Sequence, residues 1–123
     1  MATSVIKKEN PYNNASVVCK CPKIVVNSLT SGEPYSNWGG VFYYKIGCRV
    51  HLHIGVSNLP NTDWTANALF TLPSGYIPSV AQQTTVLGQT NHDYSTVNVL
   101  TNGQVRAYGG TAYALADIEY DVF

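Results

Sequence analysis

The chain has 123 residues, a formal net charge of zero and only 11% charged side chains, but nine Tyr and two Trp. This length is typical of one domain with a single core. Phosphate backbones are bound by clustered Lys and Arg, so the composition argues against a nucleic-acid partner. Low charge and many aromatic residues favour self-association or a saccharide-binding surface.

The N-terminal residues are polar and contain neither the apolar core of a signal peptide nor a run long enough to span a membrane. We therefore expect a protein made in the cytoplasm, which the resemblance described below implies to be bacterial, without membrane insertion. Residues 1–15 are expected to be a linker or lead-in, and residues 16–123 a single domain. Cys19, Cys21 and Cys48 are odd in number and badly spaced for a disulfide framework, so we expect free thiols.

Short apolar or alternating segments, separated by Gly and Pro, follow one another along the chain. None has the i, i+3, i+4, i+7 spacing of an amphipathic helix, so each predicts a β-strand. The expected strands are residues 17–19, 23–29, 40–46, 48–56, 66–72, 80–87, 96–100, 105–108 and 111–120. Such a series predicts an all-β fold, an antiparallel β-sandwich with a jelly-roll-like arrangement.

Two turns in the second half of the chain are specified by their residues. Asn102-Gly103 lies between two alternating segments, and we expect it to fill both positive-φ positions of a type I′ hairpin turn. Upstream, the segment 72–78 (Leu-Pro-Ser-Gly-Tyr-Ile-Pro) is expected to form a stiff corner. Its prolines cannot lie within a central strand, and Gly75 tolerates a positive φ.

The order of several landmarks resembles a pattern found in tailed-phage tail proteins. They are Trp38-Gly39-Gly40, Tyr43-Tyr44-Lys45-Ile46-Gly47, the 72–78 corner and the hairpin at Asn102-Gly103. The pattern occurs in the C-terminal receptor-binding or head domains of tail fibres and baseplate proteins. The resemblance implies a homotrimeric head in the virion that contacts other tail or baseplate proteins and attaches to a bacterial cell-surface saccharide. We expect Tyr43, Tyr44 or neighbouring aromatic residues at the subunit interface.

A saccharide site needs a ring that stacks on the sugar and polar groups that bind its hydroxyls. The loop of residues 61–64 and the loop of residues 88–94 each combine an aromatic side chain with such polar groups. The alternative is that both aromatic side chains pack beneath their own loops. We expect the ligand-binding residues to be Trp64, Asp63, His92, Asp93 and Trp38.

His51 and His53 lie on one face of an alternating strand. We expect an exposed polar face with two ordinary histidines, and neither a metal nor a cofactor. Two alternatives stay open: three such His pairs around a trimer axis, or a zinc site that also uses Cys19 and Cys21.

Catalytic motifs are absent from the sequence, which contains neither a Gly-x-Ser-x-Gly elbow nor a His-Glu-x-x-His pair. Asp117, Glu119 and Asp121 alternate on the last strand and predict a solvated face. They would form a glycosidase pair only if a second strand closed a cleft around them. We therefore expect a non-enzymatic attachment domain. The alternatives are a monomeric carbohydrate-binding module and, less favoured, a small cell-wall hydrolase.

Overall fold

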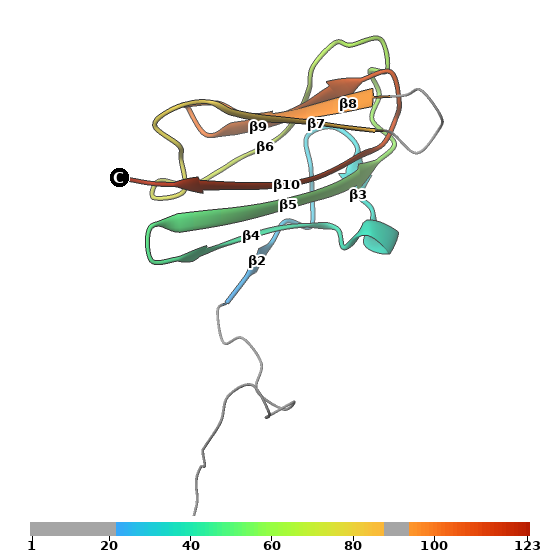
Figure 1. Ribbon diagram of the computed structural model, residues 1–123. Helices are drawn as coiled ribbons and strands as arrows, with labels where there is room; N and C mark the ends of the chain where they lie inside the picture. Colours follow the sequence, from blue (N-terminus) through green and yellow to red (C-terminus); the bar gives the residue numbers. More distant parts are fainter. Residues whose placement is uncertain (1–21, 88–93) are drawn as a thin grey trace, which may run out of the picture.

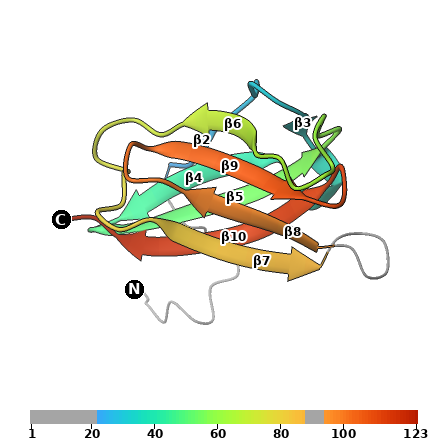
Figure 2. The same ribbon diagram turned by 90° about the horizontal axis from the view of Figure 1, so that it is seen from above.

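The computed structural model describes residues 22–87 and 94–123 (Figure 1). Two antiparallel sheets pack face to face, which confirms the expected all-β sandwich (Figures 1 and 2). The first sheet has the order β10-β5-β4-β2, with β3 also paired to β5, and the second has the order β6-β9-β8-β7. Within the described ranges, no helix is long and apolar enough to cross a membrane.

Most strands lie within a few residues of their predicted positions. The expected strand at 23–29 shrinks to two residues, and a short strand, β3, lies between the expected strands at 23–29 and 40–46. The predicted strand at 17–19 lies outside the described residues. A 3-10 turn, η2 (Ser36–Trp38), precedes β4. The strands are β2 (Ile24–Val25), β3 (Glu33–Pro34), β4 (Val41–Ile46), β5 (Arg49–Ser57), β6 (Asn67–Thr71), β7 (Gln82–Leu87), β8 (Tyr94–Val99), β9 (Gln104–Gly109) and β10 (Ala114–Asp121).

The core forms between the inner faces of the two sheets. Along residues 49–54 of β5 and along β10, buried apolar residues alternate with outward, mostly polar ones, as a half-buried strand requires. Each fully buried Val, Leu or Ile contributes about 1.5–3 kcal/mol through removal from water. The side chains with 1% exposure or less that fill the centre include Val50, Leu52, Ile54, Val56, Leu69, Val97, Val99 and Val105.

Two hairpins define the register. The β4–β5 hairpin turns over Gly47 and Cys48, with Gly47 at φ +60, as in a type II′ turn. Cys48 is a free, exposed thiol, as expected, and the other two cysteines lie outside the described residues.

The hairpin at Asn102-Gly103 is confirmed, but the expected type I′ turn is wrong. Gly103 has φ +89, whereas Asn102 does not have a positive φ. The Gly103 N–H donates to Leu100 O, and the Leu100 N–H donates to Gln104 O. This is a three-residue loop, a type I turn followed by a left-handed Gly. It is favoured because Asn102 Oδ1 accepts the Gln104 N–H at 3.0 Å.

The 72–78 corner packs against the first sheet. Gly75 has φ +94, as expected for its turn, and its carbonyl accepts a hydrogen bond from Lys45 Nζ at 2.8 Å. Lys45 Nζ also lies 4.8 Å above the Tyr76 ring, and Tyr43 packs edge-to-face on that ring at 5.0 Å. Two landmarks of the tail-protein resemblance therefore contact each other. Tyr43 is only 6% exposed, so its expected place at a subunit interface is wrong, because the ring is part of the core.

Candidate functional site

Trp64 and Tyr94, the aromatic residues of the two expected ligand-binding loops, are hydrogen-bonded through their backbones to Gly109 and Gly110. The Trp64 N–H donates to Gly109 O, and the Gly110 N–H donates to Tyr94 O, each at 3.1 Å. A Cβ at Gly109 would collide with the Tyr94 carbonyl oxygen and lie 2.7 Å from Ser95 Cα. Gly109 therefore allows a close backbone approach that another residue would prevent. Trp64 and Tyr94, far apart in the sequence, are brought to the same strand end.

Trp64 has an unusual backbone conformation. Its φ is +67, a left-handed value that is rare for a bulky residue, and its side chain is 50% exposed. The ring packs edge-to-face against Tyr108, with centroids 6.0 Å apart and planes at 78°. The ring is therefore positioned by the protein while half of its surface stays available to a ligand.

Two short networks hold the loop that carries Trp64. The Asn67 side chain, 1% exposed, accepts the Asn61 N–H at 3.0 Å and donates to Asn61 O and Ala107 O at 2.9 and 3.1 Å. Asp63 Oδ1 accepts the Thr65 N–H at 3.3 Å. Hydrogen bonds from the Thr65 hydroxyl and then from its N–H lower the pKa of the Asp63 carboxyl. The loop is thus fixed before any ligand arrives.

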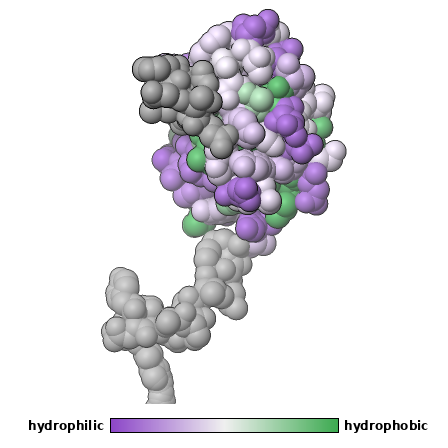
Figure 3. Space-filling model, turned by 90° about the vertical axis from the view of Figure 1, so that its right-hand side faces the viewer, coloured by the Kyte–Doolittle hydropathy of each residue, from purple (hydrophilic) through white to green (hydrophobic). Residues whose placement is uncertain are grey.

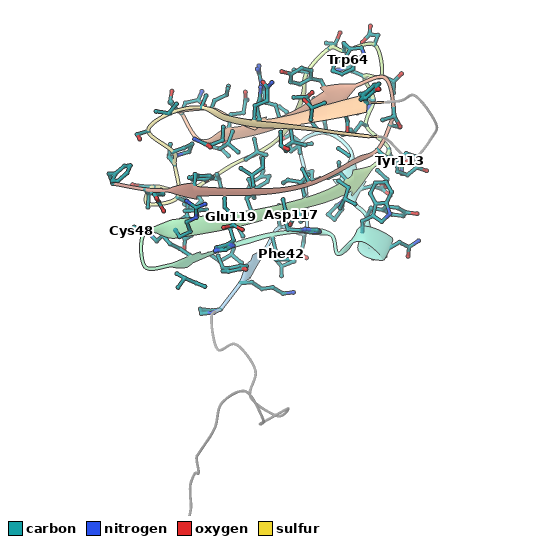
Figure 4. All side chains as sticks on the ribbon, viewed as in Figure 1. Phe42, Cys48, Trp64, Tyr113, Asp117 and Glu119 are labelled. Atoms are coloured by element: carbon teal, nitrogen blue, oxygen red, sulfur yellow. The ribbon has the colours of Figure 1, made fainter. Side chains whose placement is uncertain are left out.

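A line of contacts continues from Trp64 along the outer face of the second sheet. The Tyr108 hydroxyl accepts a hydrogen bond from Asn98 Nδ2 at 3.2 Å, and Asn98 Oδ1 accepts one from Arg106 Nε at 3.4 Å. Tyr94 lies beside this line and is 47% exposed. We call Trp64, Tyr94, Tyr108, Asn98 and Arg106 the aromatic strip. Figure 4 shows Trp64 on the outer side of the second sheet, away from Asp117 and Glu119 on the first.

The surface around this end of the sandwich is mostly polar. Figure 3 shows hydrophilic and neutral residues over most of this end, with only small, separated hydrophobic patches. Exposed aromatic rings within a polar surface suit a ligand that has both an apolar ring face and many hydroxyls. A saccharide has both properties.

Trp38 belongs to a different cluster. Its ring packs against Tyr35 and Tyr113, with centroids 5.0 and 5.6 Å away. Within the part of the chain that the structure describes, no ring contact connects this cluster to Trp64. The structure thus places Asp63 next to Trp64 as expected and separates Trp38 from them.

His92 and Asp93 lie outside the described residues, so their predicted role stays a prediction. They immediately precede Tyr94, which belongs to the aromatic strip.

Cross-strand rows cover the outer face of the first sheet. Phe42, His53 and Asp117 are in register on β4, β5 and β10. The Phe42 and His53 rings stack with their centroids 4.9 Å apart. Tyr44, His51 and Glu119 form the next row, with rings 4.7 Å apart and nearly parallel. A shallow hollow of about 210 Å³ lies among these side chains. Rings stacked at the spacing of adjacent strands stand upright on the sheet, so they turn edges rather than faces to solvent.

Protein groups already engage the polar atoms of this hollow. His53 Nδ1 lies 2.7 Å from Asp117 Oδ1, and His53 Nε2 lies 2.6 Å from Trp38 O. His51 Nδ1 lies 3.6 Å from Glu119 Oε2. Among the described residues, no group of three or more His, Cys, Asp or Glu is arranged to hold a metal ion. A zinc site with Cys19 and Cys21 would involve residues outside the described ranges.

The alternating carboxylates of β10 form ion pairs on this solvated face. Arg49 Nε lies 3.4 Å from Glu119 Oε1, and Arg49 Nη1 lies 3.3 Å from Asp121 Oδ1. These pairs are about half exposed and contribute little to stability. The face has the chemistry of a salt-bridged sheet surface.

Sequence reasoning missed Asn98, Arg106 and Tyr108. In this strand, polar and apolar residues alternate strictly, with Val105 and Ala107 between the polar ones. That alternation was the available signal that Arg106 and Tyr108 share the outer face. The Gly109-Gly110 doublet that ends β9 was a second one, since consecutive glycines often mark a close backbone approach.

No protein-family model matches the chain, and comparisons with curated proteins and with solved structures found no match either. The fold and the geometry of the aromatic strip are therefore the observations from which we infer a function.

Proposed function

We propose that this chain is a non-enzymatic attachment domain that binds a bacterial cell-surface saccharide through the aromatic strip. Trp64 carries the proposal, because a large ring is held half-exposed on a left-handed backbone. That conformation costs about 1–2 kcal/mol. Such strain persists only where the surroundings enforce it, and it is concentrated at binding and active sites.

The neighbours of Trp64 support the same ligand class. Tyr94 offers a second exposed ring, and on the same outer face the Tyr108 hydroxyl accepts a hydrogen bond from the Asn98 amide. Stacking on a sugar ring and hydrogen bonding to its hydroxyls need this combination of groups. The resemblance of the ordered landmarks to tail-fibre and baseplate heads supports a saccharide on a bacterial surface, and a virion location.

The proposal includes a homotrimer, as the resemblance implies. A shallow site with few stacking rings binds with a dissociation constant on the order of micromolar to millimolar. Three copies on one particle would raise the effective affinity by about two to four orders of magnitude. Tyr44, on the outer face of the first sheet, is the remaining candidate from our two expected interface tyrosines. Sedimentation should show trimers; a monomer at high concentration would favour the alternative of a monomeric carbohydrate-binding module.

Substitution of Trp64 tests the proposed site. Binding of the parent, Trp64→Ala and Phe123→Ala should be compared on an array of bacterial cell-wall saccharides and on intact cells. Phe123 is fully exposed and lies at the C-terminus, at the opposite end of the sandwich (Figures 1 and 4). We expect Trp64→Ala to weaken binding by about tenfold or more with the fold intact, and Phe123→Ala to bind normally.

Equal binding by Trp64→Ala and the parent would show that Trp64 is a packing residue. A parent protein that binds no saccharide on the array or on cells would refute the proposed function. Cleavage of a bound saccharide would instead favour the hydrolase alternative.

A further inference from the structure

The two sheets differ sharply in the charge of their outer faces. On the outer face of the first sheet, Arg49, His51 and His53 pair with the three carboxylates of β10, which are Asp117, Glu119 and Asp121. The strands β6 to β9 of the second sheet carry one charged side chain, Arg106, and no carboxylate. The remaining outward side chains of β7 and β8 are mainly amides and hydroxyls, such as Gln83, Thr85 and Thr96.

Arg106 has an incomplete set of partners. It lies in register between Ala68 on β6 and Asn98 on β8. Its Nε donates to Asn98 Oδ1, but among the described residues neither Nη group has a hydrogen-bond partner and no carboxylate pairs with the guanidinium. Ala68 offers only a methyl group on that side. Among the described residues, no side chain therefore neutralises this positive charge.

The guanidinium lies on the same line of contacts as the exposed rings. Arg106 contacts Asn98, Asn98 contacts Tyr108, and the Tyr108 ring contacts Trp64. Residues two apart on a strand are separated by about 6.7 Å, so Arg106 and Tyr108 can contact adjacent parts of one saccharide.

We propose that the saccharide bound by the aromatic strip is acidic and that Arg106 binds the carboxylate of a uronic acid. This inference rests on the proposed function, since it names the ligand class of the same surface. A planar carboxylate matches the paired N–H groups of a guanidinium. Phosphate sites usually gather several cations or free backbone N–H groups. Arg106 is a single cation on a strand whose backbone is paired on both sides.

Matched ligands and variants test the proposal. Calorimetric titration would use oligogalacturonate, hyaluronan fragments, the same oligomers with carboxyls reduced to alcohols, and poly(glycerol phosphate). Arg106→Gln removes the charge, Arg49→Gln removes a cation from the opposite sheet, and Asp63→Asn removes the carboxylate next to Trp64. Thermal unfolding of each variant confirms its fold.

We expect the parent to bind at least one uronate about tenfold or more tightly than its reduced form. Arg106→Gln should abolish this preference but keep the binding that depends on Trp64. Arg49→Gln should keep the preference for the uronate. Asp63→Asn should keep or increase that preference. The preference should also weaken as the salt concentration rises from about 0.05 M to about 0.5 M.

Other outcomes would overturn the inference in distinguishable ways. If reduced and acidic oligomers bind equally, or if Arg106→Gln keeps the preference, the acidic class is wrong while the proposed function stands. If poly(glycerol phosphate) binds most tightly and its binding depends on Arg106, the group that Arg106 binds is a phosphate and the proposed carboxylate is wrong. If the parent binds no saccharide here or on the array, both proposals fail.

Discussion

Replacement of Gly109 by Ala tests whether a close backbone approach builds the aromatic strip. The new Cβ would collide with Tyr94 O and lie 2.7 Å from Ser95 Cα, both backbone atoms of β8. Backbone atoms cannot rotate away, so β8 or β9 must shift. Over-packing costs typically about 1–3 kcal/mol, and a backbone clash predicts the upper end of that range. For a domain of this size, such a loss lowers the unfolding midpoint by roughly 10–15 °C.

Gly110 provides a matched control at the next position. Its Cβ would first meet Trp64 Nε1 at 3.7 Å, an ordinary contact, and neither glycine has a positive φ. Gly110→Ala should change the free energy of unfolding by less than about 0.5 kcal/mol. Urea and thermal unfolding, followed by circular dichroism and Trp fluorescence, would measure both variants. If Gly109→Ala proves as stable as Gly110→Ala, the backbone of β9 does not approach Tyr94 and Ser95 as described.

Three further predictions concern single side chains. Burial raises the pKa of Tyr120 to about 12, so its contribution to stability is complete below about pH 10 and is lost as the pH rises towards 12. That loss, on the order of 2 kcal/mol, should be missing from Tyr120→Phe in urea titrations at alkaline pH. Trp64→Gly should be about 1 kcal/mol more stable than Trp64→Ala, since only Gly avoids the left-handed penalty at φ +67; equal stabilities would exclude that backbone conformation. Asn102→Ala should lower the free energy of unfolding by about 1 kcal/mol, because one hydrogen bond is lost. Gly103→Ala should lower it more, because of these two residues only Gly103 has a positive φ. Equal losses in urea denaturation would indicate a type I′ turn.

Local sequence patterns predicted the two-sheet architecture and most of its strands. In β10 and in residues 49–54 of β5, period-two alternation alone separates the buried residues from the outward ones. The 72–78 corner was equally readable, because two prolines and one glycine restrict the backbone there. These features depend on neighbours in the sequence, so the sequence contains the information needed to predict them.

Features that depend on distant neighbours could not be predicted in the same way. In the apolar run at 23–29, only Ile24 and Val25 form strand, opposite Tyr43 and Phe42 respectively, so most of the run is not strand. β3 forms because Glu33 and Pro34 reach the end of β5, with proline at a position that tolerates it.

The candidate site shows the same limit. An aromatic residue beside polar groups was visible in each of two loops, but the placement of Trp64 and Tyr94 at one strand end was not. Gly109 and Gly110 join Trp64 to Tyr94 by backbone hydrogen bonds that depend on the register of β8 and β9. Trp38, chosen for its residue type alone, instead packs with Tyr35 and Tyr113.

Nuclear magnetic resonance most directly tests the central claim, which is that the aromatic strip binds a saccharide. A labelled sample would be titrated with fragments of bacterial cell-wall saccharide while the backbone amide, indole and guanidinium N–H signals are followed. We expect shifts concentrated at the Trp64 indole N–H, the Arg106 Nε–H and the amides of Tyr94 and Gly110. Shifts confined to the outer face of the first sheet, around His51 and its neighbours, or no shifts with any fragment, would contradict it.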